Sequence, residues 1–355
     1  MHSRFASPGA LMALASAALF GASTPLAKLL LGAGVDPWLL AGLLYLGSGV
    51  GLSTVLLIRR ATGRANAEAP LRRADAPWLA AVILAGGVIG PLLLLLGLAR
   101  TPASSAALLL NVEGLATMGI AWVVFRENVD RRLLLGAFAI LAGAVLLSWR
   151  GGPQGVGLGA LAVIGACLAW GIDNNLTRKL SSADPLQITA IKGVVAGLVN
   201  LALALANGAH LPSAGGIAAA GVVGFFGFGV SLVLFVLALR HLGTARTGAY
   251  FSTAPFLGAA LSLILFQEAP TLLLAAAAAL MGVGVYLHLS ESHEHEHAHE
   301  AIDHEHRHVH DAHHQHAHGP ADPPGEPHAH PHHHAPIRHK HPHYPDLHHR
   351  HGHAP

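Results

Sequence analysis

The chain has 355 residues, of which 52% are hydrophobic and only 11% are charged, and its formal net charge is +2. Soluble domains carry about 25% charged residues, so this composition leaves too little polar surface to face water and excludes an ordinary soluble globular domain. The small net charge gives no indication of a nucleic-acid partner, and the one cysteine, Cys167, excludes an intrachain disulfide.

Ten apolar runs precede residue 290, and each approaches the length of about 20 residues that a membrane-spanning helix needs. They cover residues 8–31, 37–58, 77–99, 103–125, 132–149, 156–177, 185–207, 215–239, 244–266 and 270–289. Pro, Gly or charged residues separate them, as at Asp36-Pro37 and Asp184-Pro185. The first run follows Arg4, but its length and the nine later runs predict an uncleaved helix rather than a signal peptide.

Basic residues predict the orientation of these spans, because short cytoplasmic loops are rich in Lys and Arg. With a cytoplasmic N-terminus, the cytoplasmic segments hold 13 Lys and Arg residues, whereas the outer segments hold only Lys28, Arg100 and Arg150. We therefore expect a multi-pass protein of the cell's inner (plasma) membrane, surrounded by the lipid bilayer, with both termini in the cytoplasm.

The chain contains an internal repeat. GLARTPASSAALLLNVEGLATMGIAWVVFRENV, which starts at Gly97, aligns without gaps with ALRHLGTARTGAYFSTAPFLGAALSLILFQEAP, which starts at Ala238. Residues 18–28 also align with residues 168–178, which places Gly21 on Gly171. Each half has five spans, and because five is odd, the second half crosses the membrane in the opposite sense, as is typical of secondary transporters.

These observations predict an all-α integral membrane protein with ten transmembrane helices. Residues 1–149 and 150–290 are expected to form two inverted five-helix repeats, and residues 291–355 a disordered tail.

The chain resembles the drug/metabolite transporter superfamily, specifically its EamA-like branch, over about residues 8–289. Three pairs of features carry the resemblance: the segments Gly21 to Lys28 and Gly171 to Arg178, the Asp-Pro starts of spans two and seven, and the acidic ends of spans four and nine at Glu127 and Glu268. The resemblance implies a secondary carrier, often an exporter of metabolites, amino acids or drugs. Span two of the family often carries a basic residue where this chain has Tyr45, whereas span seven keeps one, Lys192.

Ionisable residues inside a span are costly in lipid and are therefore functional candidates. Glu113, near the middle of span four, is predicted to be a protonatable or cation-binding carboxylate, or else a structural one held by hydrogen bonds or a pairing charge. Thr117, one turn later, shares its helix face, whereas Asn111 lies about 200° away around the helix.

A second set of candidates lies where spans six and seven meet. Asp173 and Asn174 occupy the last third of span six, Thr177 shares a face with Asp173, and Lys192 is seven residues into span seven. The short link between the spans predicts that Asp173 and Lys192 pair, either as a static contact or as one that breaks when substrate or a proton arrives. The candidates for the transport site are Asn111, Glu113, Thr117, Asp173, Asn174 and Lys192.

The tail is rich in histidine: 24 of the 28 histidines lie between His293 and His353, mixed with Glu, Asp and Pro. Neutral imidazole is a ligand favoured by nickel, cobalt, zinc and copper, so the tail is expected to bind transition-metal ions at several interchangeable sites. The candidate ligands are His293, His295, His297, His299, His304, His306, His308, His310, His313, His314, His316 and His318. Because histidine titrates near neutral pH, a sensor of pH or a binder of acidic lipids is the alternative.

The leading hypothesis is a secondary transporter, proton-coupled or facilitative, that is linked to nickel, cobalt or zinc handling through this tail. Its substrate would be a small molecule or a metal, it would require no cofactor, and a homodimer is the candidate assembly. One alternative is an exporter of a small organic metabolite or amino acid whose tail senses metal or pH, and another is a non-transporting metal sensor. An enzyme is not expected, because the spans contain no nucleophile–base pair, cofactor loop or rigid metal motif.

Overall fold

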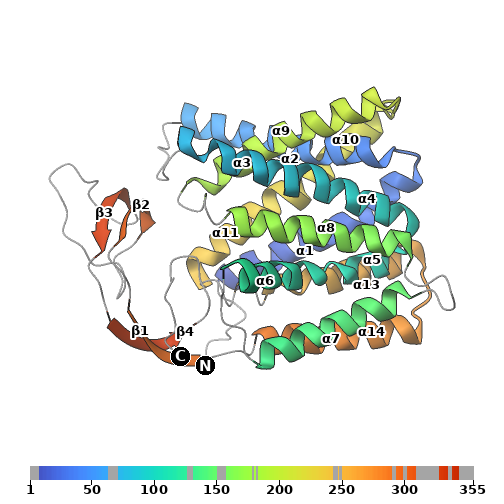
Figure 1. Cartoon of the computed structure of the whole chain (residues 1–355). Coiled ribbons are helices and arrows are strands. Elements are labelled where there is room, and N and C mark those ends of the chain that lie inside the picture. The colour runs from blue at the N-terminus through green and yellow to red at the C-terminus, as the bar shows by residue number, and fades with distance from the viewer. Residues whose placement is uncertain are drawn as a thin grey trace.

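The computed structural model describes residues 8–62, 71–125, 131–149, 157–177, 180, 183–242, 247, 250–289, 293–298, 302–308, 328–334 and 338–343. The helices run side by side in one bundle (Figure 1). The first half comprises α1 (Pro8–Gly32), α2 (Pro37–Ala61), η2 (Arg73–Asp75), α3 (Ala76–Val82), η3 (Ile83–Ile89), α4 (Gly90–Arg100), α5 (Ala103–Leu109), α6 (Val112–Phe125) and α7 (Arg131–Ser148). The second half comprises α8 (Leu158–Thr177), α9 (Pro185–Ala206), α10 (Ala214–Gly224), η6 (Phe225–Val230), α11 (Ser231–Leu242), α13 (Ala254–Phe266) and α14 (Leu272–Leu289).

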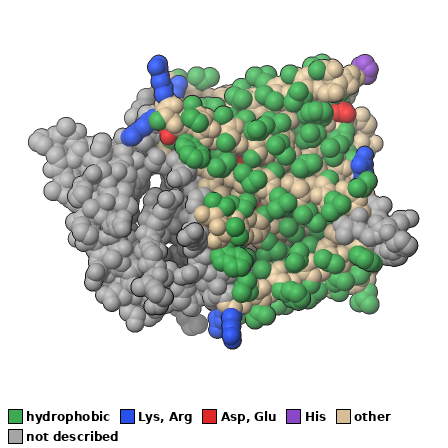
Figure 2. All heavy atoms as spheres, in the orientation of Figure 1, with side chains coloured by type: hydrophobic (Ala, Val, Ile, Leu, Met, Phe, Trp, Pro, Cys, Tyr) green, Lys and Arg blue, Asp and Glu red, His purple; other side chains and the backbone are tan. Residues whose placement is uncertain are grey.

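The bundle has the surface of a membrane protein. In the described part of the chain, eight helical segments are long and apolar enough to span a bilayer, and two shorter apolar helices, Ala254–Phe266 and Leu272–His288, occupy the positions of the ninth and tenth predicted spans. Hydrophobic side chains cover the middle of the visible face, while Lys and Arg side chains lie at its ends (Figure 2). Exposed side chains such as Val123, Phe138 and Leu158 would be unfavourable in water but suit contact with lipid.

Basic residues gather at one end of the bundle, where α2 finishes and α7 begins. The exposed ones there are Arg59, Arg60, Arg72, Arg73, Arg131 and Arg132. Arg100, which is also exposed, lies at the end of α4, and α4 finishes at the opposite end of the bundle. This asymmetry agrees with the loop charges counted from the sequence, and the assignment of this end to the cytoplasm stays a prediction.

The two Asp-Pro pairs play the same role in the two halves. Asp36 caps α2 by accepting hydrogen bonds from the backbone N–H groups of Trp38 (2.9 Å) and Leu39 (3.0 Å). Asp184 caps α9 in the same way through Leu186 N (2.9 Å). In each pair the proline occupies the first turn, where its missing N–H is not needed by the helix.

The packing of the halves shows their inverted relation. Gly21 of α1 lies against the backbone of Ala254 and Gly258 in α13, so a Cβ there would collide with Ala254 O. Its repeat partner Gly171 of α8 lies against α6, where a Cβ would come within 2.8 Å of the Ala116 side chain. The first helix of each half thus packs on the fourth span of the other half, which is the exchange that an inverted repeat produces.

Glycines also allow α2 and α9 to approach closely at the centre of the bundle. A Cβ on Gly193 would come within 2.6 Å of the Gly49 backbone, and one on Gly197 within 2.6 Å of Leu46. Small residues at helix contacts are characteristic of packing within membranes, because backbones can then approach and gain van der Waals contact.

The described parts of the tail have extended backbone. They form four short strands, β1 (His293–Ala298), β2 (Ile302–His308), β3 (His328–His334) and β4 (Arg338–His343). That the tail as a whole is disordered stays a prediction. β1 pairs antiparallel with β4, and β2 with β3. The alternation of histidine with other residues has a period of two, which is also the period of a strand, and this explains the extended backbone.

We predict that Gly193→Leu separates α2 from α9 and lowers the thermal stability of the purified protein. Overpacking of this kind typically costs about 1–3 kcal/mol. Gly119→Leu is the matched control, because a Cβ at Gly119 meets nothing within 4 Å. Thermal unfolding in detergent, followed by size-exclusion chromatography, would measure both variants, and equal stability would contradict this role of the α2–α9 contact.

Candidate functional site

The third span carries a π-helical segment, η3, whose carbonyl groups organise the site. Pro91 has no N–H, so the carbonyl of Gly87, four residues earlier, lacks its usual α-helical donor. The N–H of Gly90 bonds to Ala85 O, which also leaves Gly86 O without its usual partner. Such π segments are frequent at functional sites.

Side chains from three other helices supply the missing donors. Tyr45 Oη of α2 donates to Gly86 O at 2.7 Å, and Trp170 Nε1 of α8 donates to the same oxygen at 3.0 Å. Asn200 Nδ2 of α9 donates to Gly87 O at 2.9 Å. The two freed carbonyls therefore join α2, α8 and α9 to the third span.

Asp173 and Lys192 form a buried ion pair beside this segment. Lys192 Nζ donates to Asp173 Oδ2, and the two side chains are only 18% and 7% exposed. Thr177 Oγ1 donates to the other carboxylate oxygen at 3.1 Å. Asp173 lies directly against Gly86, where any Cβ would collide with its carboxylate. The pairing predicted from the sequence is thus confirmed.

Glu113 lies near the start of the second part of the fourth span. This span is not one regular helix, because α5 ends at Leu109 and α6 starts at Val112, with a tight turn between them in which Asn111 N bonds to Leu108 O (3.0 Å). Glu113 therefore sits in the first turn of α6, where the helix dipole favours a negative charge.

Amide side chains of α8 bind this part of the fourth span. Asn174 Nδ2 donates to Glu113 Oε1 at 3.0 Å and to Thr117 Oγ1 at 3.2 Å, while Thr117 Oγ1 lies 3.0 Å from Glu113 O. Asn175 Nδ2 donates to Thr117 O at 3.0 Å. The expectation that Glu113 and Thr117 share a face is confirmed.

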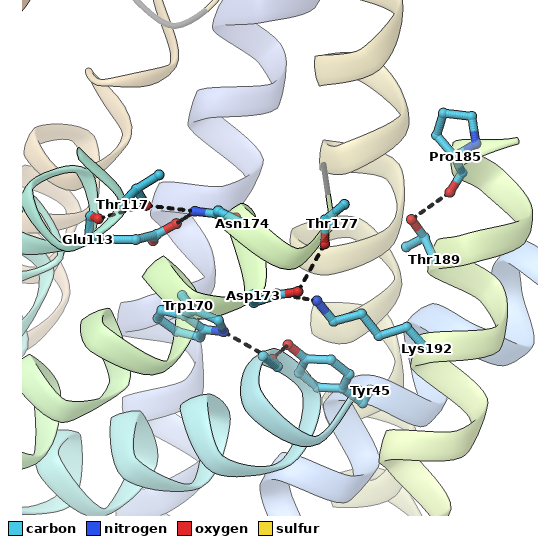
Figure 3. A network of polar contacts seen from close by, with 11 residues as sticks. Tyr45, Glu113, Thr117, Trp170, Asp173, Asn174, Thr177, Pro185, Thr189 and Lys192 are labelled. Carbon is cyan, nitrogen blue, oxygen red and sulfur yellow. Dashed lines mark hydrogen bonds and ion pairs between the residues drawn. The ribbon is translucent and has the colours of Figure 1, made fainter. Parts of the chain in front are cut away.

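The structure brings five of the six candidates together. Glu113 and Thr117 lie to one side of α8 and Lys192 to the other, with Asn174 and Asp173 between them (Figure 3). Asn111 is apart: its buried amide donates to Leu108 O at 2.8 Å and approaches Met281 Sδ of α14 at 3.9 Å. We name Glu113, Thr117, Asp173, Asn174 and Lys192 the polar cluster. Its two carboxylates and one ammonium group give it a formal charge of −1.

Sequence reasoning missed the residues that support the polar cluster. Tyr45, Trp170 and Asn200 have polar groups but no charge, so the rule that favours intramembrane charges did not single them out. The sequence GGVIGP, which ends at Pro91, carries a usable signal, because a proline inside a span leaves carbonyls that need donors from elsewhere.

Two charged residues with repeat partners fasten the loop between the third and fourth spans. Lys28 Nζ donates to Leu98 O and to Thr101 O (3.0 Å), where α4 ends. Glu268 accepts from the backbone N–H of Ala103 (2.9 Å) and of Ser104 (3.3 Å), and from the Ser104 hydroxyl, where α5 begins. Their repeat partners, Arg178 and Glu127, lie outside the described residues.

The predicted metal ligands lie in the tail. His293, His295 and His297 fall in β1, and His304, His306 and His308 fall in β2. His299, His310, His313, His314, His316 and His318 lie outside the described residues. Among the residues that the structure describes, no group of three or more His, Cys, Asp or Glu residues is placed to hold a metal ion.

We predict that Lys192→Met destabilises the protein strongly, because it leaves the Asp173 carboxylate buried without its counter-charge. Breaking a buried pair typically costs about 3–5 kcal/mol, whereas removing both charges can be nearly neutral. Asp173→Asn combined with Lys192→Met should therefore recover most of the lost thermal stability. A double variant no more stable than Lys192→Met alone would refute this account of the pair.

Comparisons with known proteins agree with this architecture. The model of the EamA-like transporter family matches residues 7–149 and again residues 157–290. An uncharacterized transporter from Methanothermobacter thermautotrophicus (strain Delta H) is 29% identical over 269 residues, covering 70% of this chain and 76% of that protein. A solved crystal structure with a TM-score of 0.56 and 22% identity, covering 79% of this chain and 95% of its own, shares the fold. Because the family model accounts for both five-helix halves, the chain belongs to the EamA-like transporter family and is a multi-pass membrane transporter.

Proposed function

We propose that this protein is a secondary transporter of the inner membrane that moves its cargo through the polar cluster. The observation that carries the proposal is the buried Asp173–Lys192 pair at the interface of the two inverted repeats. Charges in lipid are retained where they serve substrate or ion pathways, and transporter sites lie near the midplane between repeats. A pair that exchanges partners when cargo arrives fits this position.

The tail adds a link to transition metals. Histidines recur at every second position in β1 and β2, and the backbone register places His295 opposite His341 and His306 opposite His330. Imidazole donors at such density favour nickel, cobalt or zinc. In this proposal the tail lies in the cytoplasm, binds one of these metals at the inner mouth and adjusts transport to the metal supply.

The polar cluster itself favours an organic cargo as the second candidate. Its members offer carboxylate, amide, hydroxyl and ammonium groups, whereas transition metals prefer imidazole and thiolate. An exporter of an organic metabolite, regulated by metal or pH through its tail, accommodates both observations.

We predict that replacing all 24 tail histidines between His293 and His353 by asparagine abolishes stoichiometric binding of nickel, cobalt and zinc by the full-length protein. The change removes the imidazole nitrogens while keeping the tail's length and polarity. Metal content after dialysis, measured by mass spectrometry, reports binding, and thermal unfolding checks that the membrane part is intact. Unchanged metal content in the variant, or unchanged metal tolerance of cells that carry it, would reject the link between the tail and metal.

A further inference from the structure

The two halves have diverged where the polar cluster lies. The alignment that places Gly21 on Gly171 also places Ser23 on Asp173 and Phe20 on Trp170. The alignment of the fourth and ninth spans, continued into the third and eighth, places Gly227 on Gly86 and Phe228 on Gly87. The eighth span has its own π-helical segment, η6, at the corresponding position.

The divergent residues occupy equivalent places in space. A Cβ on Gly86 would collide with the Asp173 carboxylate, and a Cβ on Gly227 would come within 2.7 Å of Ser23 Cβ. The inverted repeat therefore repeats the contact between the first helix of one half and the π segment of the other. Of these two contacts, only the one between α8 and η3 contains a charged side chain, Asp173.

The other copy carries aromatic rings. Phe20 of α1 lies 6.0 Å from Phe228 of η6 and 5.4 Å from Phe251, measured between ring centroids, and Phe251 lies 4.9 Å from Phe235 of α11. All four side chains are half-buried. We name Phe20, Phe228, Phe235 and Phe251 the aromatic cluster.

Tyr45 connects the aromatic cluster to the polar cluster. Its ring lies 5.7 Å from that of Phe228, and its hydroxyl bonds to Gly86 O, against which the Asp173 carboxylate also packs. A Cβ on Gly87 would be 3.7 Å from both the Tyr45 ring and the Lys192 side chain. The polar cluster and the aromatic cluster therefore meet at Tyr45.

The charges and hydrogen bonds in and around the polar cluster favour a ligand that is positively charged and donates hydrogen bonds. Lys192 neutralises Asp173, whereas Glu113 receives only the neutral amide of Asn174 among the described residues. Asn175 Oδ1 and Asn200 Oδ1, both buried, accept no hydrogen bond from the part of the chain described. Unpaired acceptors and a net negative charge are complementary to a ligand that carries N–H donors and a positive charge.

We infer that the cargo is a small amphipathic amine, with its protonated nitrogen at Glu113 and its apolar or aromatic body against the aromatic cluster. The inference rests on the proposal that the polar cluster is the transport site. An anion would meet the net negative charge, and a bare metal ion would gain little from the phenylalanine rings. A cation next to aromatic rings gains further from their negative faces.

The test measures binding of three probes to the full-length protein in lipid nanodiscs by titration calorimetry. 2-Phenylethylamine carries both features, 2-phenylethanol lacks the charge, and propylamine lacks the ring. We expect 2-phenylethylamine to bind about tenfold or more tightly than either of the others, the difference that one charge-assisted hydrogen bond or one buried ring produces. Equal binding of the amine and the alcohol would overturn the inference.

Variants separate the contribution of the Glu113 charge to binding from that of the aromatic cluster. Glu113→Gln should remove the preference for the amine over the alcohol, and Glu113→Asp, which keeps the charge, should retain most of it. Phe228→Leu should weaken 2-phenylethylamine but leave propylamine unchanged. An undiminished amine preference in Glu113→Gln would refute the role of Glu113, and thermal unfolding confirms that each variant is folded.

Failure of the amine inference and failure of the proposed transport function would give different results. The assay needs neither flux nor metal, so amine binding without transport into vesicles would refute transport and leave the binding site standing. Transport without any amine preference would refute the inference alone.

Discussion

Inside a bilayer there is no water to bond a backbone group that leaves its helix, so each released carbonyl needs a donor from the protein. Pro91 creates this requirement in the third span by freeing the carbonyls of Gly86 and Gly87. Tyr45, Trp170 and Asn200 meet it. Two of their helices, α8 and α9, also carry Asp173 and Lys192. Satisfying two backbone oxygens therefore fixes where the charged pair lies.

The inverted repeat produces this arrangement twice, and the two versions differ in their side chains. Both halves place a π-helical segment in their third span and pack it against the first helix of the other half. The contact between α1 and η6 has Ser23 where the contact between α8 and η3 has Asp173, and Phe228 where the latter has Gly87. The first contact is therefore aromatic and the second is charged. A symmetric scaffold has thus acquired an asymmetric interior, charged on one side and aromatic on the other. Such an interior can bind the two ends of one molecule differently.

The sequence predicted those features that depend on periodicity and on charge. Apolar runs identified the ten spans, and the costly charges identified Asp173 and Lys192 as partners across a short loop. The Asp-Pro pairs marked two helix starts, where Asp36 and Asp184 act as caps. Each of these follows from residues close together in the chain or from a general rule of lipid solvation.

Features that depend on contacts between distant spans were not predictable in the same way. The π segments, the turn that divides the fourth span before Glu113, and the donors that serve Gly86 all depend on which helices become neighbours. Asn111 shows the opposite case, since its polar side chain within a span turned toward Met281 instead of the polar cluster. The pairing of the tail strands is a further example, because it joins segments that are far apart in the chain.

If cargo reaches the polar cluster, it should protect a thiol introduced at Gly114 from modification. Gly114 is exposed, follows Glu113, and has open space where a Cβ would lie. The native Cys167 is buried and provides the background. We expect that Gly114→Cys reacts with a small maleimide and that 2-phenylethylamine slows this reaction several-fold, while 2-phenylethanol does not. A reaction rate that is unaffected by the amine would contradict this expectation.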